Sequence, residues 1–253
     1  MIIYTLLFYI LLQTVTSLKL FDRSDICPLG VVSCSAQASN VDTCCVPKYG
    51  LMVLVQQWDT GLGQSDQFTL HGLWPDTCTG DQTGDSGFDN SRIYTNISSI
   101  IEESGDAELV DAMNLHWPSN KGDNNAFWSH EWNKHGTCVS TLNPRCYGPE
   151  YKKYRDVIDY FSAVLGLRKK YDLYKALSDK GIEPSDSEQY TADEFKRALR
   201  DGLGIEAAIK CKSGRLEEIW TWFVVRDAAV YVPVNQTFAS DTCKNSFVYT
   251  PKD

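Results

Sequence analysis

The sequence predicts a single α+β domain in which helices flank a central antiparallel sheet that disulfides stabilise. Strand-like segments lie near both ends of the chain with helical segments between them, and the lack of strict alternation argues against a doubly wound sheet. Nine cysteines are many for 253 residues and suit an oxidising compartment. No internal repeat, low-complexity tract or Pro/Ser-rich linker divides the chain, so one domain is favoured over two.

Hydrophobic periodicity places the strands at the two ends of the sequence. Residues 51–58 form an apolar run, and a second strand passes through residues 68–70 into His71. The last two strands are expected at 219–225 and 229–234, so they are close enough in sequence to form a hairpin.

Helices are expected between these strands. Thr191-Ala192-Asp193-Glu194 is a capping box that opens a helix ending near Gly202. Asn124-Asn125 offer caps for a helix over residues 126–135, and Gly136 is placed to end it. The other helical segments are residues 91–103, 106–114 and 150–179.

The first residues form a short apolar run that ends by Gln13. A membrane-spanning helix needs about 20 apolar residues, whereas this run has the length of a signal-peptide core and small residues follow it at 15–17. Because no Lys or Arg precedes the run, an N-terminal strand or core helix is the alternative. We expect a signal peptide over 1–17, a mature domain over 18–253, and no membrane association after cleavage.

The cysteines and glycosylation motifs point to export. Cys44 and Cys45 are adjacent, so each must pair elsewhere, and no CxxC pairs have zinc-finger spacing. An odd count leaves at least one thiol free or bonded to another chain. Asn96-Ile97-Ser98 and Asn235-Gln236-Thr237 are glycosylation acceptors in an exported chain. We expect a protein that is secreted or delivered to a vacuole- or lysosome-like lumen.

The charge of the chain limits its partners. The formal charge is −9, and residues 1–17 carry no charged side chain, so signal cleavage leaves it unchanged. An acidic chain is not an obvious binder of polyanions. A polyanion would have to be held by a local positive cluster, or at a pH where histidines are charged and some carboxylates are not.

Histidine occurs four times, and two of the four lie in the helix expected over 126–135. At about 100° per residue, Glu131 and His135 are four apart and share a face. His130 and Lys134 form a second pair of the same spacing beside the first. One small surface can therefore carry two imidazoles, a carboxylate and an ammonium group.

Other interpretations of these histidines have to be weighed. A zinc-protease motif needs histidines four apart on one face, whereas His130 and His135 are five apart and rotated by about 140°. Lys134 between them would also repel a cation, so we exclude that motif. A solvated amphipathic helix with a Glu–Lys pair is the plainer alternative. A lone histidine such as His71, at a strand end before a turn, is more often structural than catalytic.

Together, two segments resemble one family. HGLWP at 71–75 and WSHEWNKHGTC at 128–138 resemble the two active-site segments of the ribonuclease T2 family. The likeness extends through Cys44-Cys45, the strand GLMVLVQQW at 50–58, Trp-Pro-Ser-Asn at 117–120 and the C-terminal cysteines, and it is strongest to fungal members.

The resemblance implies an endoribonuclease that cuts RNA by transphosphorylation to a 2′,3′-cyclic phosphate, which is then hydrolysed to a 3′-phosphate. His135 is implied as the general base and His71 as the general acid, with the roles reversed in hydrolysis. Lys134 would stabilise the phosphorane, Glu131 would orient His135 or hydrogen-bond the phosphoryl group, and His130 would help hold the phosphate.

The same resemblance implies the conditions and partners of the reaction. The substrate is single-stranded RNA, DNA is inert because it lacks the 2′-hydroxyl, and neither a cofactor nor a metal is required. One histidine must be neutral while the other is protonated, so a bell-shaped pH profile in the acid range is expected. We expect a monomer.

Base recognition is implied for two pockets. Trp74 would stack on the base 5′ to the cut, the alternative being a core position, and Asp76 would accept a hydrogen bond from an exocyclic amine such as that of adenine. Fungal relatives have a tyrosine near position 82, where this chain has Gln82, so base preference stays open. Lys121 is a basic variant beside the pocket for the following base, whose matching residues are Gln57, Pro118, Ser119, Asn120 and Phe127.

The resemblance also accounts for the odd cysteine. Cys138 normally pairs with a cysteine in the segment occupied here by Gly87-Phe88-Asp89, so we expect Cys138 to be a free thiol. Losing one native bridge costs about 2–5 kcal/mol unless packing around Phe88 compensates. The other eight cysteines are implied to pair as Cys27–Cys45, Cys34–Cys78, Cys44–Cys146 and Cys211–Cys243.

Two other functions compete with RNA cleavage. A secreted RNA- or partner-binding recognition protein on the same fold is one, since function resides in the site and not in the fold. Loss of a catalytic histidine or of the Glu–Lys pair would have favoured such a binding protein, but all of these residues are present. A metal-dependent phosphodiesterase is the other, but the sequence lacks a suitable acidic or histidine cluster.

Overall fold

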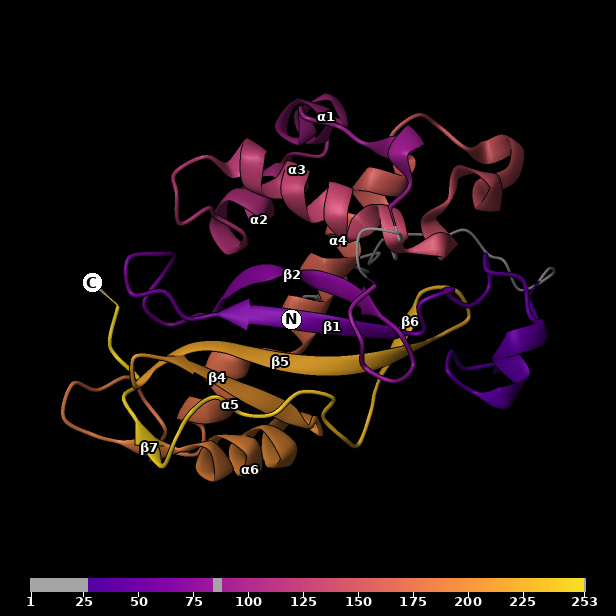
Figure 1. Ribbon diagram of the computed structural model, residues 1–253. Helices are drawn as coiled ribbons and strands as arrows, with labels where there is room; N and C mark the ends of the chain where they lie inside the picture. Colours follow the sequence, from indigo (N-terminus) through magenta and orange to yellow (C-terminus); the bar gives the residue numbers. More distant parts are fainter. Residues whose placement is uncertain (1–26, 84–87, 253) are drawn as a thin grey trace, which may run out of the picture.

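One antiparallel sheet forms the centre of the computed structural model, which describes residues 27–83 and 88–252 (Figure 1). The expected signal peptide over 1–17 lies outside the described residues. The sheet has the order β2-β1-β5-β4, and β6 pairs with the end of β5. Its strands are β1 (Leu51–Gln57), β2 (Thr69–Asp76), β4 (Ala207–Lys212), β5 (Arg215–Arg226) and β6 (Val230–Pro233), and a second small sheet pairs β3 (Tyr190–Thr191) with β7 (Ser246–Phe247).

Helices cover one face and one edge of the sheet. In Figure 1, α1, α2 and α3 lie above the edge strand β2, and α4 passes behind the sheet. Among the described residues, no helix is long and apolar enough to cross a membrane. The α-helices are α1 (Ile97–Glu103), α2 (Ala107–His116), α3 (Asn124–Lys134), α4 (Arg155–Lys170), α5 (Leu173–Ser178) and α6 (Ala192–Leu203), and the 3₁₀ turns are η1 (Ala36–Asn40), η3 (Asn90–Arg92), η4 (Gly136–Cys138), η5 (Ser140–Leu142) and η6 (Pro144–Glu150).

The α+β prediction is confirmed. The helical segment expected over 150–179 is two helices, α4 and α5, and strands β3, β4 and β7 were not predicted. Other differences lie at element ends. The predicted capping box of Thr191 and Glu194 is present at the start of α6. Asp123 caps α3 by accepting the Ala126 N–H at 2.9 Å, where we expected Asn124-Asn125 to do so. Strand β2 does not end at His71 but continues to Asp76, because an edge strand tolerates Pro75.

Two apolar cores pack against the two faces of the sheet. The larger lies between one face of the sheet and the helices and contains the fully buried Trp117, Trp132 and Tyr160. The smaller lies on the opposite face around Val53 and Trp222. Because both faces of β1 are buried, its sequence is a continuous apolar run and does not alternate. Burial of each large apolar side chain contributes about 1.5–3 kcal/mol.

Four disulfides are present, and they are the four pairs that the resemblance implies. Cys138 is buried and has no disulfide partner, and all nine cysteines lie within the described residues. Both glycosylation acceptors, Asn96 and Asn235, are exposed. The disulfides are Cys27–Cys45, Cys34–Cys78, Cys44–Cys146 and Cys211–Cys243.

Candidate active site

His71 lies in a β-bulge of the edge strand β2. The pairing register of β1 and β2 shifts between Val55 and Gln56, and His71 is the extra residue on β2. A bulge breaks the alternation of side chains and re-aims the bulged residue. His71 and Trp74 are three positions apart and would point to opposite faces of a regular strand. Because of the bulge, both line the same pocket.

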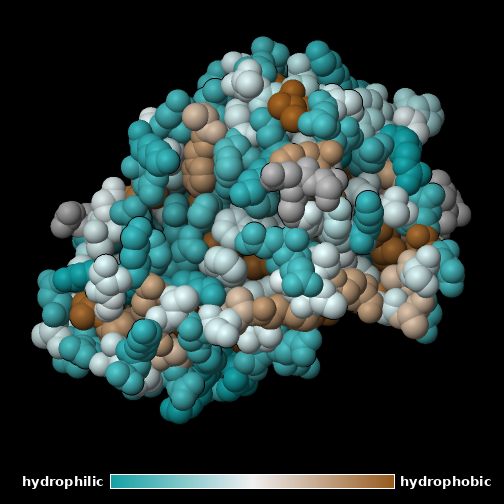
Figure 2. Space-filling view, viewed as in Figure 1, coloured by the Kyte–Doolittle hydropathy of each residue, from teal (hydrophilic) through white to brown (hydrophobic). Residues whose placement is uncertain are grey.

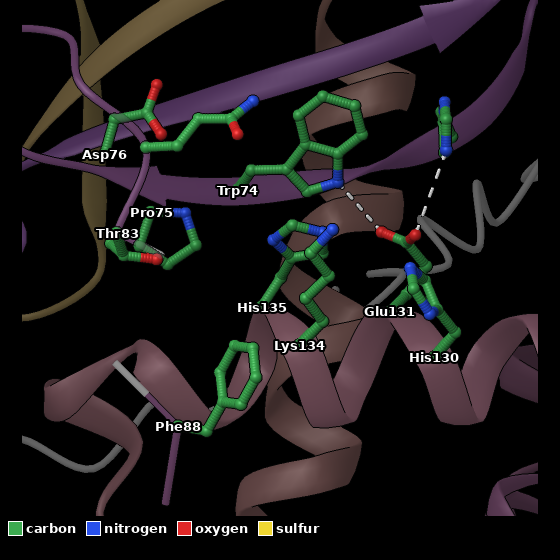
Figure 3. A pocket seen from close by; sticks show the side chains of 11 residues that line it. Trp74, Pro75, Asp76, Thr83, Phe88, His130, Glu131, Lys134 and His135 are labelled. Atoms are coloured by element: carbon green, nitrogen blue, oxygen red, sulfur yellow. Dashed lines mark hydrogen bonds and ion pairs between the residues drawn. The ribbon is translucent and has the colours of Figure 1, made fainter. Parts of the chain in front are cut away.

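The end of α3 supplies the opposite wall of this pocket. The helix ends at Lys134, and His135 follows as its C-cap with φ −119° and ψ −51°. We expected His135 inside the helix and turned about 140° away from His130. Because His135 departs from helical angles, the two ring centroids lie 6.3 Å apart and both rings line the pocket (Figure 3). Lys134 and Glu131 line it as well, so the four polar residues of the motif converge.

Glu131 is fully buried at the bottom of the site. Its Oε2 accepts a hydrogen bond from Trp74 Nε1 at 2.9 Å (Figure 3). Its Oε1 has no hydrogen-bond partner among the described residues and lies 3.9 Å from His71 Nε2. The close approach requires glycine at position 72, where a Cβ would collide with the carboxylate. Burial raises the pKa of Glu131 to about 7. The side-chain hydrogen bond that orients Glu131 thus comes from Trp74. We had expected Glu131 to orient His135 or to hydrogen-bond the phosphoryl group.

Trp74 lies between the two catalytic candidates. Its indole stacks on His135 with ring centroids 5.1 Å apart, and it meets His71 edge-on with centroids 4.9 Å apart. A third contact, edge-on at 5.3 Å, is with Trp220 of β5. Aromatic contacts of this geometry fix ring orientation. Trp74 therefore sets the planes of both histidines.

The pKa values of the two histidines are shifted in opposite directions. Burial, reinforced by the positive charge of Lys134, lowers the pKa of His135 to about 2. Burial also acts to lower the pKa of His71, but the hydrogen bond with Glu218 and the charges of nearby carboxylates outweigh it and raise that pKa. A neutral His135 can therefore accept a proton at a pH where His71 still carries one to donate.

The same cluster contains a possible set of metal ligands. One nitrogen from each of His130 and His135 and one oxygen of Glu131 lie within 4.8 Å of one another. Regular helical geometry predicted no such convergence, and that prediction was wrong because His135 lies past the helix end. Imidazole and carboxylate suit a borderline metal such as Zn²⁺, but Lys134 lines the same pocket and repels a cation. The combination favours an anion, such as a phosphoryl group, over a metal.

The pocket continues toward Asp76. Burial, with a smaller contribution from the charge of Asp81, raises the pKa of Asp76 to about 7. Gln82 pairs with Asp76 through an isolated backbone bridge, and both residues line the pocket. Thr83 and Phe88 line it on the same side as Asp76 (Figure 3). Phe88, which we expected only to pack near Cys138, thus supplies an aromatic ring to the site.

A second hollow begins on the other side of His71. It has a volume of about 390 Å³ and is lined by Gln57 and Asn120, both expected to contact the following base. The ring centroid of Phe127, a third expected residue, lies 5.8 Å from that of His71. The face drawn in Figure 2 is mostly hydrophilic and is hollowed between the helices above and the sheet below.

Two tryptophans hold the loop at 117–120 against His71. Trp117 Nε1 donates to the His71 carbonyl at 2.9 Å, and Trp128 Nε1 donates to the Trp117 carbonyl at 2.7 Å. Within this loop Ser119 is buried and Pro118 is half-buried, whereas Asn120 and the following Lys121 are exposed.

The family model described as the Ribonuclease T2 family matches residues 49–243. This span covers more than half of the chain and includes the bulged strand, the end of α3 and strand β5. The chain belongs to the ribonuclease T2 family.

This T2 ribonuclease is similar to curated fungal enzymes and to solved structures. Ribonuclease Rh from Rhizopus niveus is 44% identical over 226 residues, which cover 89% of this chain and 92% of that protein. Ribonuclease T2 from Aspergillus oryzae is 40% identical over 237 residues, covering 89% and 84%. The crystal structure of Actibind, a T2 ribonuclease, matches with a TM-score of 0.80 at 37% identity and covers 88% of this chain and 95% of that one.

Glu218, which was not among the predicted site residues, also contacts the site of this T2 ribonuclease. Glu218 Oε1 lies 2.5 Å from His71 Nδ1, and its Oε2 accepts a hydrogen bond from Trp220 Nε1 at 2.7 Å. The two residues are 147 positions apart, and no local motif links them. The available signal is an acidic pair, Glu217 and Glu218, directly before the apolar run that was predicted to be a strand.

Proposed function

We propose that this T2 ribonuclease is an endoribonuclease that cleaves single-stranded RNA by metal-independent transphosphorylation. The 2′-hydroxyl attacks the adjacent phosphorus and expels the 5′-oxygen, and water later opens the 2′,3′-cyclic phosphate to a 3′-phosphate. The substrate brings its own nucleophile, so the protein must take one proton and give another. The opposite pKa shifts of His135 and His71, which line one pocket, carry this proposal.

The protonation states support one assignment of roles. Neutral His135 takes the proton of the 2′-hydroxyl, and protonated His71 gives its Nε2 proton to the departing 5′-oxygen. In the hydrolysis step the roles reverse, so that each histidine returns to its starting state. Each proton transfer typically contributes about 10²- to 10⁴-fold in rate.

Three neighbours act on the phosphoryl group. Lys134 stabilises the negative charge that the phosphorane gains. Glu131, whose pKa is raised to about 7, holds a proton in acid and can donate a hydrogen bond to a phosphoryl oxygen. Burial, with the charges of Lys134 and His71, lowers the pKa of His130, so His130 is a neutral hydrogen-bond donor that helps hold the phosphate.

The two hollows beside His71 accommodate the bases on either side of the cut. Trp74 and Asp76 receive the base 5′ to the cut, and Gln57, Asn120 and Phe127 contact the following base. Nucleotide binding is supported by a similar structure, a mutant of RNase MC1 in complex with 5′-GMP, which is 25% identical with a TM-score of 0.56. DNA is not a substrate because it lacks the 2′-hydroxyl.

The disulfides and the exposed acceptors Asn96 and Asn235 support an exported enzyme. We place its activity outside the cell or in a vacuole- or lysosome-like lumen, after removal of residues 1–17, and as a monomer. Intact-mass analysis and light scattering of the protein recovered from the culture medium test the processed N-terminus, the glycans and the monomer together.

The deciding experiment is cleavage of a short single-stranded RNA from pH 4 to 8 with EDTA present. Wild type is compared with His71→Ala and His135→Ala, and a DNA of the same sequence is the substrate control. We expect a 2′,3′-cyclic phosphate product, a bell-shaped profile, and loss of activity in both variants. No cleavage by folded wild type would reject the enzymatic proposal and make RNA or partner binding the next test.

A further inference from the structure

The contact between His71 and Glu218 is made across a strand. His71 lies on β2 and Glu218 on β5, and β1 runs between them. Adjacent strands are about 4.8 Å apart, so the two side chains must reach over β1 to meet. The bulge at His71 lies on one side of this contact. On the other side, the β4–β5 register shifts directly after the Lys210–Glu218 pair. A contact made by a bulged residue across an intervening strand is a specific feature of this sheet.

Both hydrogen bonds to the Glu218 carboxylate come from ring nitrogens. Trp220 Nε1 can only donate, and it occupies Oε2 at 2.7 Å. His71 Nδ1 occupies Oε1 at 2.5 Å. Burial acts to raise the pKa of Glu218, but its bonds with His71 and Trp220 and the charge of Lys210 outweigh it and lower that pKa. An ionised carboxylate accepts only, so His71 Nδ1 carries the proton.

We propose that Glu218 is the positioning residue of His71, whose carboxylate fixes the proton on Nδ1 and turns Nε2 toward the scissile phosphate. This inference deepens the proposed function and rests on it. With Nδ1 always protonated, Nε2 is the nitrogen that gives its proton to the 5′-oxygen. After that step Nε2 is free to take a proton from the water that opens the cyclic phosphate. One fixed tautomer therefore serves both steps.

Other charged groups also act on His71. Glu131 of α3 faces its Nε2 from 3.9 Å, and Glu218 is the carboxylate bonded to Nδ1. Of these two carboxylates, Glu218 is the one placed to fix the tautomer, because Glu131 lies beyond hydrogen-bond distance. The charged or titratable neighbours whose charges couple to His71 are Glu131, Glu217, Glu218, His130 and His135.

The chain offers a matched control next to the proposed residue. Glu217 carries the same charge, is 46% exposed, and faces Lys212 at 3.5 Å. Glu217→Gln removes one charge from the same strand without touching His71 Nδ1. Glu218→Gln removes the charge. It also replaces one carboxylate oxygen with an NH₂ group, so that one of the two donors, His71 or Trp220, would face another donor in place of an acceptor. Glu218→Asp keeps the charge on a shorter side chain.

The kinetic test is a pH profile of kcat and KM for these three variants. For Glu218→Gln we expect kcat to fall about 10- to 100-fold, the range for partners that orient a functional histidine, with KM little changed. Because Glu218 raises the pKa of His71, its loss should also move the alkaline limb of the profile to lower pH. Glu218→Asp should recover part of both effects. Glu217→Gln removes a charge that also raises the pKa of His71 but no hydrogen bond to it, so kcat should stay near the wild-type value and the alkaline limb should move by less than in Glu218→Gln.

A titration without substrate separates this inference from the proposed function. NMR of the imidazole resonances should show a lower His71 pKa in Glu218→Gln than in wild type and in Glu217→Gln, whether or not RNA is cleaved. Glu218→Asp, whose shorter side chain weakens the hydrogen bond to Nδ1, should lower the His71 pKa by less, which covers a Glu218→Gln protein that does not fold. An unchanged alkaline limb together with an unchanged His71 titration in folded Glu218→Gln would overturn the proposal.

Discussion

The indole of Trp74 stacks on the imidazole of His135, with ring centroids 5.1 Å apart and ring planes 24° apart. The same indole donates its N–H to the buried Glu131 carboxylate at 2.9 Å. Trp74 therefore joins the two halves of the site, since it belongs to β2 and both of its partners belong to the α3 segment. A residue expected mainly to stack on a base is also the contact that aligns the proposed general base.

Trp74→Phe should destabilise the protein more at neutral pH than in acid. Phenylalanine keeps an aromatic ring but leaves Glu131 without its donor, and an unpaired buried polar group costs about 1–3 kcal/mol. The cost should grow as Glu131 ionises near pH 7. Urea unfolding at pH 5 and pH 7 measures it, and the effect should shrink in a Glu131→Gln background. Equal losses in both backgrounds would contradict the assignment.

Lys134→Ala should lower kcat by about 10²- to 10³-fold, the usual loss when one group that stabilises transition-state charge is removed. The charge of Lys134 also helps lower the pKa of His135. Its removal should therefore move the acid limb of the pH profile to higher pH. Lys121→Ala, a change of the same charge at an exposed position, is the control and should leave that limb in place. A Lys134→Ala enzyme with wild-type kcat would exclude the role.

Asp76→Asn should gain stability relative to wild type as the pH rises from about 4 to 7. The pKa of Asp76 is about 7 in the folded protein against an ordinary value of 3.8, so the folded state holds more protons in this range. Wild type thus loses up to about 1.4 kcal/mol per pH unit from this group. The difference between the proteins is the useful quantity, because the lowered pKa of His135 acts in the opposite direction. A pH-independent difference in unfolding free energy would refute the expectation.

Cys138 should be the one thiol that reacts with an alkylating reagent, and only after unfolding. It is buried, its Sγ–H points to the Lys134 carbonyl at 3.4 Å, and burial raises its pKa, so the reactive thiolate is disfavoured. Mass spectrometry should find no label on the native protein and one label after unfolding without reduction. Reduction should expose all nine cysteines. A disulfide-linked peptide that contains Cys138 would overturn the prediction.

Gln82→Tyr should strengthen binding of a base in the pocket near Asp76. Gln82 lines this pocket, and a tyrosine ring there would add a stacking surface. Stacking of a base on an aromatic side chain contributes about 1–3 kcal/mol. Calorimetry with 5′-AMP measures the gain, and ribose 5-phosphate, which has no base, should show none. Equal gains for both ligands would mean that the new side chain does not stack.

Local sequence was sufficient for several parts of this protein. The capping box at Thr191 and Glu194, the strand at 51–57 and the helix that carries His130 and Glu131 depend on neighbours within a few residues. The two motifs at 71–75 and 128–138 also identified the family, because catalytic residue types recur there at fixed local spacing.

Tertiary structure decided how those residues meet. The bulge that turns His71 into the pocket exists only when β2 pairs with β1, and the departure of His135 from α3 is set where the helix end packs against β2. Glu218 reaches His71 only because the sheet places β5 one strand beyond β1. Local sequence does not specify such partners, because strand order and register depend on contacts between segments more than a hundred residues apart.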